Sequence, residues 1–308
     1  MSFSKEAAMR TEAGTSSPDD GSLLHEAGVR RRLAVFIRRS PLFGVGMLLC
    51  LSILMIAAFA PLIAPYPEDA GTTVRFASRL QPPSAQFWFG TDEVGRDVLS
   101  RVLMGTQATI MMALTVLFIS VLIGVPLGVI AGFWKIGMLS GTIMRVTEVF
   151  LAIPSLVFVL SVSALLGPSL PVTILAISLA WWTWYARLAY GETLLLQQQQ
   201  FVDAARVAGA SSLRIAFSEI LPNLTSVLLV KITVDLGYVV LLGASLGFLG
   251  LGVQAPTPEW GVMIANGREL LPDAWWLVTF PGLAIVITVV AFNLLGDGIS
   301  DFLSSAYD

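Results

Sequence analysis

Long uncharged apolar stretches constrain this chain more than any other feature. Residues 102–134 form a run of 33 residues without Asp, Glu, Lys or Arg. A helix rises about 1.5 Å per residue and a bilayer core is about 30 Å thick, so about 20 such residues can cross a membrane. Because this run is too long for one upright span and too short for two with a turn, we expect a tilted helix or an interfacial start.

Further apolar stretches predict an all-α membrane protein with about six transmembrane helices. Residues 149–186 are also uncharged, but Gly167-Pro168-Ser169-Leu170-Pro171 divides them, which predicts a tight hairpin between two spans. Hydrophobic residues make up 56% of the 308 residues and charged residues 13%, which is not typical of a soluble domain. The predicted spans cover residues 42–64, 102–134, 146–166, 171–190, 224–250 and 274–298.

The chain divides into a tail and a membrane domain. Residues 1–40 are polar at first and then basic, which predicts a disordered cytosolic tail before a transmembrane domain over residues 41–308. The first apolar run, residues 42–64, is longer than the core of about 7–15 residues in a cleaved signal peptide, so we expect a retained span.

The distribution of positive charge predicts the orientation. If the N-terminus is cytosolic, the predicted inner segments hold 12 Lys and Arg and the outer loops hold 5. Positive residues concentrate on the cytoplasmic side of membrane proteins. We therefore expect both termini in the cytosol and residues 197–223 in an inner loop.

Composition argues against several classes of function. The net charge is −3 and the basic residues are dispersed, so no nucleic-acid partner is expected. With one Cys and one His in the chain, we predict neither a metal site nor histidine-based catalysis. The spans also offer no nucleophile with a base and no paired carboxylates, so we predict no catalytic residue and a chain that is not an enzyme.

The inner loop has an unusually bare surface. Good helix formers predict a short helix here, on which Ala204, Ala205 and Ala208 leave little side chain. Gly209 favours a turn or a close contact, and Pro222 is expected to hold Leu221 in an extended conformation. A bare helix allows another protein to approach closely, although a simple solvated connector between two spans remains an alternative.

Three segments resemble a known family. Asp203-Ala204-Ala205, Gly209 and Leu221-Pro222 resemble the cytoplasmic loop motif of permeases of ATP-binding-cassette importers, with Asp203 in the place of the usual glutamate. Residues 89–101 and 248–261 resemble the C-type permease of the dipeptide, oligopeptide and nickel branch. One departure is Gly243, where we expect an acidic residue in many relatives.

The resemblance implies a type I importer permease with a cytoplasmic coupling helix, in a bacterial inner membrane. The expected partners are a second homologous permease, two cytosolic ATPases that bind ATP and Mg, an extracytoplasmic binding protein and membrane lipid. The chain contains no phosphate-binding loop of the Walker type, so it is expected to hold no cofactor itself. The helix from Asp203 to Ser212 would sit in a groove of one ATPase and move as a lever.

The cargo is expected to be a dipeptide or oligopeptide, with nickel or a haem-like cofactor as the alternative. An ion-driven secondary transporter is a remote alternative. Such proteins usually have broken helices in matching halves or several intramembrane acids, and here Asp235 is the only acid well inside a predicted span.

Two further sets of residues are candidate sites. Lys231 and Asp235 lie one helical turn apart inside the fifth predicted span, which predicts an ion pair, with a place on the substrate route as the alternative. Arg96 and Asp97 at the entrance to the second span are expected to form a local ion pair or a helix cap. The last outer loop offers a possible docking surface for the binding protein, formed by Glu259, Trp260, Asn266 and Arg268.

Overall fold

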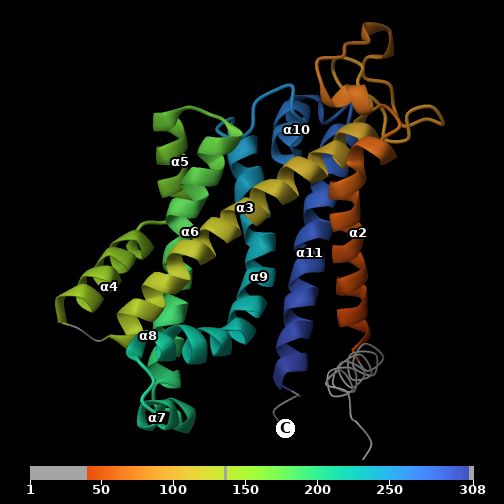
Figure 1. Cartoon of the computed structure of the whole chain (residues 1–308). Helices are drawn as coiled ribbons and strands as arrows, with labels where there is room; N and C mark the ends of the chain where they lie inside the picture. The colour runs from red at the N-terminus through yellow and green to blue at the C-terminus, as the bar shows by residue number, and fades with distance from the viewer. Residues whose placement is uncertain (1–39, 135–136, 305–308) are drawn as a thin grey trace, which may run out of the picture.

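The structure, a computed structural model, describes residues 40–134 and 137–304, and these residues form a helical bundle (Figure 1). The predicted tail, apart from its last residue, lies outside the described residues. The helices are α2 (Pro41–Ile63), α3 (Val98–Phe133), α4 (Gly137–Ala152), α5 (Ser155–Leu166), α6 (Leu170–Leu196), α7 (Gln200–Val207), α8 (Ser212–Arg214), α9 (Leu221–Phe248), α10 (Trp260–Gly267) and α11 (Trp276–Ser304).

The predicted spans correspond to helices, but not all to long straight ones. Among the described residues, four helices are long and apolar enough to cross a membrane, namely α2, α3, α11 and a 37-residue helix over Ser212–Phe248 that contains α9. The pair α4 and α5 makes a fifth candidate if its two bent halves count as one span. The fourth predicted span, residues 171–190, lies in α6, which carries Arg187 and Glu192 and is not among these candidates.

The second span begins four residues earlier than predicted. Asp97 accepts a hydrogen bond from the backbone amide of Ser100, so α3 begins at Val98 and includes Arg101. The helix then continues for 36 residues to Phe133. Figure 1 shows that α3 crosses the bundle obliquely, as its length led us to expect.

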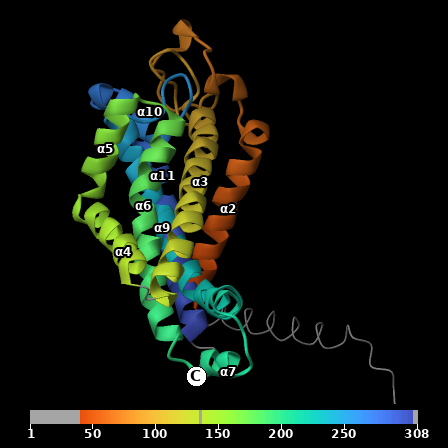
Figure 2. The same cartoon turned by 60° about the vertical axis from the view of Figure 1, so that its left-hand side comes forward.

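The third predicted span, residues 146–166, is not one straight helix. Two helices, α4 and α5, replace it and are bent by 88° at the break after Ala152 (Figure 2). Pro154 causes the break, because proline has no amide hydrogen and its ring clashes with the preceding turn of a helix. The predicted hairpin is confirmed, since α5 ends at Leu166 and Ser169 caps α6, which starts at Leu170.

The fifth span also differs from the prediction. Leu221 is helical, with φ −56° and ψ −42°, so the expected extended residue before Pro222 is wrong. The π-helix η3 (Ile215–Ile220) precedes it, and its wider turn lets Leu221 donate to the carbonyl of Ala216, five residues back. This widening accommodates the proline ring within one continuous helix.

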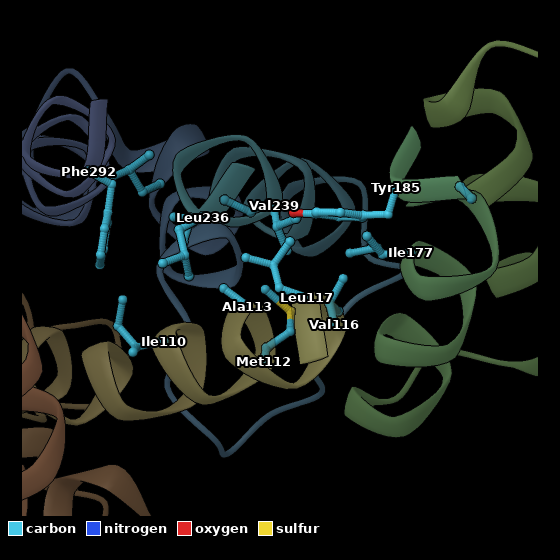
Figure 3. Packing of buried hydrophobic residues seen from close by; sticks show 14 of the residues in the cluster. Ile110, Met112, Ala113, Val116, Leu117, Ile177, Tyr185, Leu236, Val239 and Phe292 are labelled. Carbon is cyan, nitrogen blue, oxygen red and sulfur yellow. The ribbon is translucent and has the colours of Figure 1, made fainter. Parts of the chain in front are cut away.

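Small residues let α3 and α6 pack at close range. A Cβ atom added at Gly124 or Gly128 would lie 2.3 Å from a backbone carbonyl oxygen of α6, and one at Gly132 would lie 2.9 Å from Thr193. Three glycines at four-residue spacing form one face of α3, the pattern that favours close helix approach in membranes. Figure 3 shows the adjoining core, in which Tyr185 of α6 points toward Val239 of α9.

The two ends of the bundle carry different structures. Helix α7 and the C-terminal end of α11 lie at one end, whereas α10 and the connection between α2 and α3 lie at the other (Figure 1). This connection contains the short 3-10 helices η1 (Pro67–Ala70) and η2 (Phe76–Ser78). Aromatic stacking of Phe89 on Phe280, with ring centroids 3.8 Å apart, joins it to α11.

Candidate functional site

Helix α7 is a short protruding element at one end of the bundle. It spans eight residues and includes Asp203, Ala204 and Ala205, with Ala208 as its C-cap. Gly209 follows in the left-handed region at φ +81°. The amide of Gly209 donates to the carbonyl of Arg206 and the amide of Ala210 to that of Ala205, each at 3.0 Å. This pair of bonds is the Schellman motif that ends helices at glycine.

The turn corrects the extent of the expected coupling helix. We predicted one helix from Asp203 to Ser212, but α7 ends at Val207 and Ser212 begins the next helix. Gly209 explains the difference, because a left-handed residue cannot continue a right-handed helix. A Cβ atom at Gly209 would meet nothing within 4 Å in this chain, so the turn, and not a contact within the chain, accounts for the glycine.

One side of α7 is anchored and the other is open. Val202 is fully buried in the same core cluster as Ile215 and Ile220 of η3. In contrast, Val207 is 91% exposed and Ala204 and Ala208 are also exposed. One side of α7 therefore packs against the core, and its other side presents a small exposed apolar surface.

Lys231 and Asp235 form the predicted ion pair on α9. The Lys231 Nζ atom lies 2.6 Å from Asp235 Oδ1, and the indole nitrogen of Trp181 on α6 donates to Oδ2 at 3.0 Å. Asp235 is 1% exposed, whereas the Lys231 side chain is 30% exposed. The ammonium also lies 5.7 Å from the ring centroid of Trp184 and 6.0 Å from that of Tyr185.

Half of the expected docking residues are buried in this conformation. Glu259 is 1% exposed and caps α10, accepting hydrogen bonds from the amides of Gly261 and Val262, each at 3.0 Å. Burial raises the pKa of this carboxyl group. Trp260 is also buried and donates from its indole nitrogen to the carbonyl of Val102. Neither side chain can contribute to a contact surface here.

Asn266 and Arg268 remain exposed at the same end of the molecule. Asn266 lines a small hollow together with Asp92, Arg96 and Arg101. Arg268 lies over the ring of Phe248, at 5.4 Å from its centroid. The accessible polar surface at this end therefore combines α10 with the turn before α3.

The turn before α3 is held by charged groups. Arg96 pairs with Asp92 at 2.7 Å and not with Asp97, which instead is the predicted helix cap. Burial raises the pKa of Asp97, and hydrogen bonds from Ser100 oppose the shift. Arg75 donates to both carboxylate oxygens of the buried Asp69, at 2.7 and 2.5 Å, which raises the pKa of Arg75. These contacts are structural, and they fix this turn to α3.

Comparison with known proteins places the chain in a family. Residues 124–308, which contain α7, the ion pair and α10, match the model of the family described as binding-protein-dependent transport system inner membrane component. The chain belongs to this family. Residues 30–83 of the permease match a second model, the N-terminal transmembrane domain of oligopeptide transport permease C.

Individual relatives resemble the permease over most of its length. It is 43% identical over 272 residues to the probable D,D-dipeptide transport system permease protein DdpC of Escherichia coli K12, covering 88% of this chain and 90% of that one. It is 40% identical over 290 residues to the di/tripeptide transport system permease protein DppC of Pseudomonas aeruginosa, covering 92% and 94%. The glutathione transport system permease protein GsiD of Escherichia coli O6:K15:H31 is 40% identical over 266 residues, covering 86% and 87%.

A solved structure supports the fold. A chain of the MetNI methionine ABC transporter in an inward-facing conformation matches with a TM-score of 0.55 at 20% identity, covering 66% of this permease and 96% of that chain. The protein is therefore a multi-pass inner-membrane component of an ATP-binding-cassette importer, not an enzyme, and works with ATPase and binding-protein partners. The family's permeases bind no cofactor themselves.

Several residues that stabilise the structure of the permease were not predicted from the sequence. Asp69 and Arg101 are buried, and Arg101 donates to the carbonyl of Asp69 at 2.8 Å and to that of Pro256 at 3.4 Å. No local pattern joins residues this far apart in the chain. The glycine spacing on α3 was visible in the sequence and could have predicted the contact with α6.

Proposed function

We propose that the permease forms half of the transmembrane pathway of an importer for dipeptides and oligopeptides. The relatives described above are named for D,D-dipeptides, di- and tripeptides and glutathione, and each covers more than four fifths of the chain. These names favour peptide cargo over nickel or a haem-like cofactor. A second, homologous permease completes the pathway.

The observation that supports the coupling mechanism is the packing of one side of α7 against the core. Two cytosolic ATPases power the importer, and one of them binds the open side of α7 through Asp203, Ala204, Ala208 and the Gly209 turn, while Ala205 lies on the partly covered side. Val202 packs with η3, which runs directly into Leu221, Pro222 and the rest of α9. Movement of α7 is therefore transmitted to a membrane helix.

ATP binding drives the transition only through a difference in affinity between two states. In this proposal the closed ATPase pair binds one orientation of α7 better than the other, and the helices respond by opening the pathway to the opposite side. The extracytoplasmic binding protein delivers cargo to the surface that contains Asn266 and Arg268. With α7 and both termini in the cytosol, the two partners act at opposite ends of the bundle.

A single substitution tests the docking of α7. Val207→Asp places a charge on the most exposed apolar side chain of α7, with Val207→Ala as the matched control. An unpaired charge buried by the ATPase costs about 3 kcal/mol, enough to weaken docking about hundredfold. We expect substrate-stimulated ATP hydrolysis and co-purification of the ATPase to be lost in Val207→Asp and retained in Val207→Ala. Normal peptide uptake by Val207→Asp would exclude this docking surface.

The cargo is tested separately. Proteoliposomes that contain the complete importer and the binding protein should accumulate labelled trialanine in an ATP-dependent manner and should not accumulate Ni²⁺. Uptake of Ni²⁺ without uptake of peptide would replace the proposed cargo by the alternative and leave the role of α7 unchanged.

A further inference from the structure

The exposed side of α9 carries polar groups at a depth where lipid does not favour them. Val227, Tyr238, Leu241 and Phe248 are exposed, and Lys231 and Ser245 are partly exposed, at spacings of three, four or seven residues. Such spacings place these residues on one side of a helix, which we call the open face of α9. A lysine inside a predicted span is costly in lipid and normally faces protein or a water-filled cavity.

The ion pair on this face is asymmetric. Asp235 is buried and each of its oxygens is engaged, one by Lys231 and the other by Trp181. Lys231 uses one of its three donor positions for Asp235, and no further hydrogen bond of Nζ is present in residues 40–134 and 137–304. A group that approaches from the open face therefore meets the ammonium and not the carboxylate, so the local potential on that side is positive although the pair is neutral.

The side of Lys231 that faces away from Asp235 is partly open, since 30% of the Lys231 side chain is exposed. Trp184, whose ring lies beside the ammonium, is itself exposed. Toward the outer end of the open face, Leu241, Ser245 and Phe248 help to line a groove of about 300 Å³. The groove begins about 15 Å along α9 from Lys231, at Leu241, and extends to about 25 Å, at Phe248, since a helix rises about 1.5 Å per residue. It is therefore separate from the immediate surroundings of Lys231.

We propose that Lys231 forms a binding subsite for the carboxylate of the transported peptide on the route through the permease. This inference rests on the proposed function, because the C-terminal carboxylate is the anion that every short unmodified peptide carries. A charge-assisted hydrogen bond from Nζ would receive it, while Asp235 and the rings of Trp184 and Tyr185 hold the ammonium in place. Binding at this depth is transient, and release follows when the pathway opens to the cytosol.

The test uses a cysteine placed one turn from Lys231. Val227→Cys is made in a Cys50→Ala background, which removes the only natural cysteine of the chain. The assembled importer in proteoliposomes is treated, with and without ATP, with anionic sulfonatoethyl or cationic trimethylammonioethyl methanethiosulfonate. The rate at which each reagent modifies Val227→Cys is divided by the rate at which the same reagent modifies a free thiol in solution. After this correction we expect the anionic reagent to react about tenfold faster than the cationic one, because the ammonium attracts it.

Two controls assign this selectivity to Lys231. The pair of substitutions Lys231→Met and Asp235→Asn removes both charges, retains an acceptor for Trp181 and should abolish the preference at Val227→Cys. Leu229→Cys, which is exposed on the opposite side of α9, should show no change when the pair is neutralised. Failure of both reagents to reach Val227→Cys in every state would mean that protein or lipid covers the open face. That result, or equal rates for the two reagents, would overturn the subsite.

Protection by substrate identifies the ligand. Trialanine should slow modification of Val227→Cys, and trialanine amide, which lacks the carboxylate, should not. If wild-type proteoliposomes import trialanine but neither peptide protects, the subsite is wrong and the proposed function stands. If they import no peptide at all, the proposed function fails and the peptide ligand fails with it, while the charge selectivity still decides whether an anion site exists.

Discussion

Gly209 ends α7 with a backbone conformation that other residues adopt at a cost. Its φ of +81° and the open space around its Cα mean that strain, and not a clash, would oppose substitution. We expect Gly209→Val to destabilise the end of α7 by about 1–2 kcal/mol, whereas Gly209→Asn is tolerated because Asn enters the left-handed region more readily. Hydrogen exchange of the backbone amides at positions 209 and 210 and substrate-stimulated ATP hydrolysis should both differ between the two variants. Equal behaviour of the two would show that the turn has no part in coupling.

The buried carboxyl group of Glu259 should make the stability of the folded permease depend on pH. Burial raises its pKa in the folded state, so its favourable contribution is present below the unfolded value of about 4.3 and is lost as pH rises through the folded value. Glu259→Gln keeps an acceptor for the α10 amides and removes the titration. We therefore expect the unfolding temperature of the wild-type complex, minus that of the variant, to increase as pH is lowered from neutral. A difference that does not vary with pH would contradict this cause.

Local sequence spacing predicted some of these side chains and not others. The pair Lys231 and Asp235 follows from four-residue spacing on one helix, and the cap at Asp97 from its position before an apolar run. The contact of Trp181 with Asp235 comes from another helix and has no local signature. Glu259 and Trp260 look like loop surface in the sequence, but tertiary packing buries both, because α10 folds back onto α3 and α9.

At the scale of helices, the contact between α3 and α6 depends on glycine. Gly128→Leu would drive a side chain into the Ala186 carbonyl, so the two helices must separate. Gly191→Leu on α6 is the matched control, because a Cβ atom there meets nothing within 4 Å. Overpacking of a tight core costs about 1–3 kcal/mol or more. We expect Gly128→Leu to reduce the yield of folded importer in detergent severalfold and Gly191→Leu to match the wild type.

The ends of helices were predicted less well than their existence, for identifiable physical reasons. Apolar length predicted the N-terminal ends of α2 and α11 to within two residues, since the predicted spans begin at residues 42 and 274 and the helices begin at Pro41 and Trp276. The effect of each proline on the helix was harder to predict, because it depends on the conformation of the surrounding turn. Pro154 breaks the chain into α4 and α5, whereas Pro222 is absorbed by a π-helix, and Pro126 lies inside α3. Hydropathy does not distinguish these outcomes.

At the scale of the whole molecule, the proposed mechanism requires α7 and the turn before α3 to lie on opposite sides of the membrane. The two segments occupy opposite ends of the bundle, and the 12 to 5 bias of basic residues favours α7 inside. Arg206→Cys and Glu93→Cys, each in the Cys50→Ala background, test this with a maleimide that cannot cross the inner membrane. In spheroplasts we expect Glu93→Cys to react and Arg206→Cys to react only after lysis. A cytosolic ATPase cannot bind a helix on the outside of the membrane. Labelling of Arg206→Cys in intact spheroplasts would therefore show that α7 does not couple ATP hydrolysis to α9, whatever the cargo is.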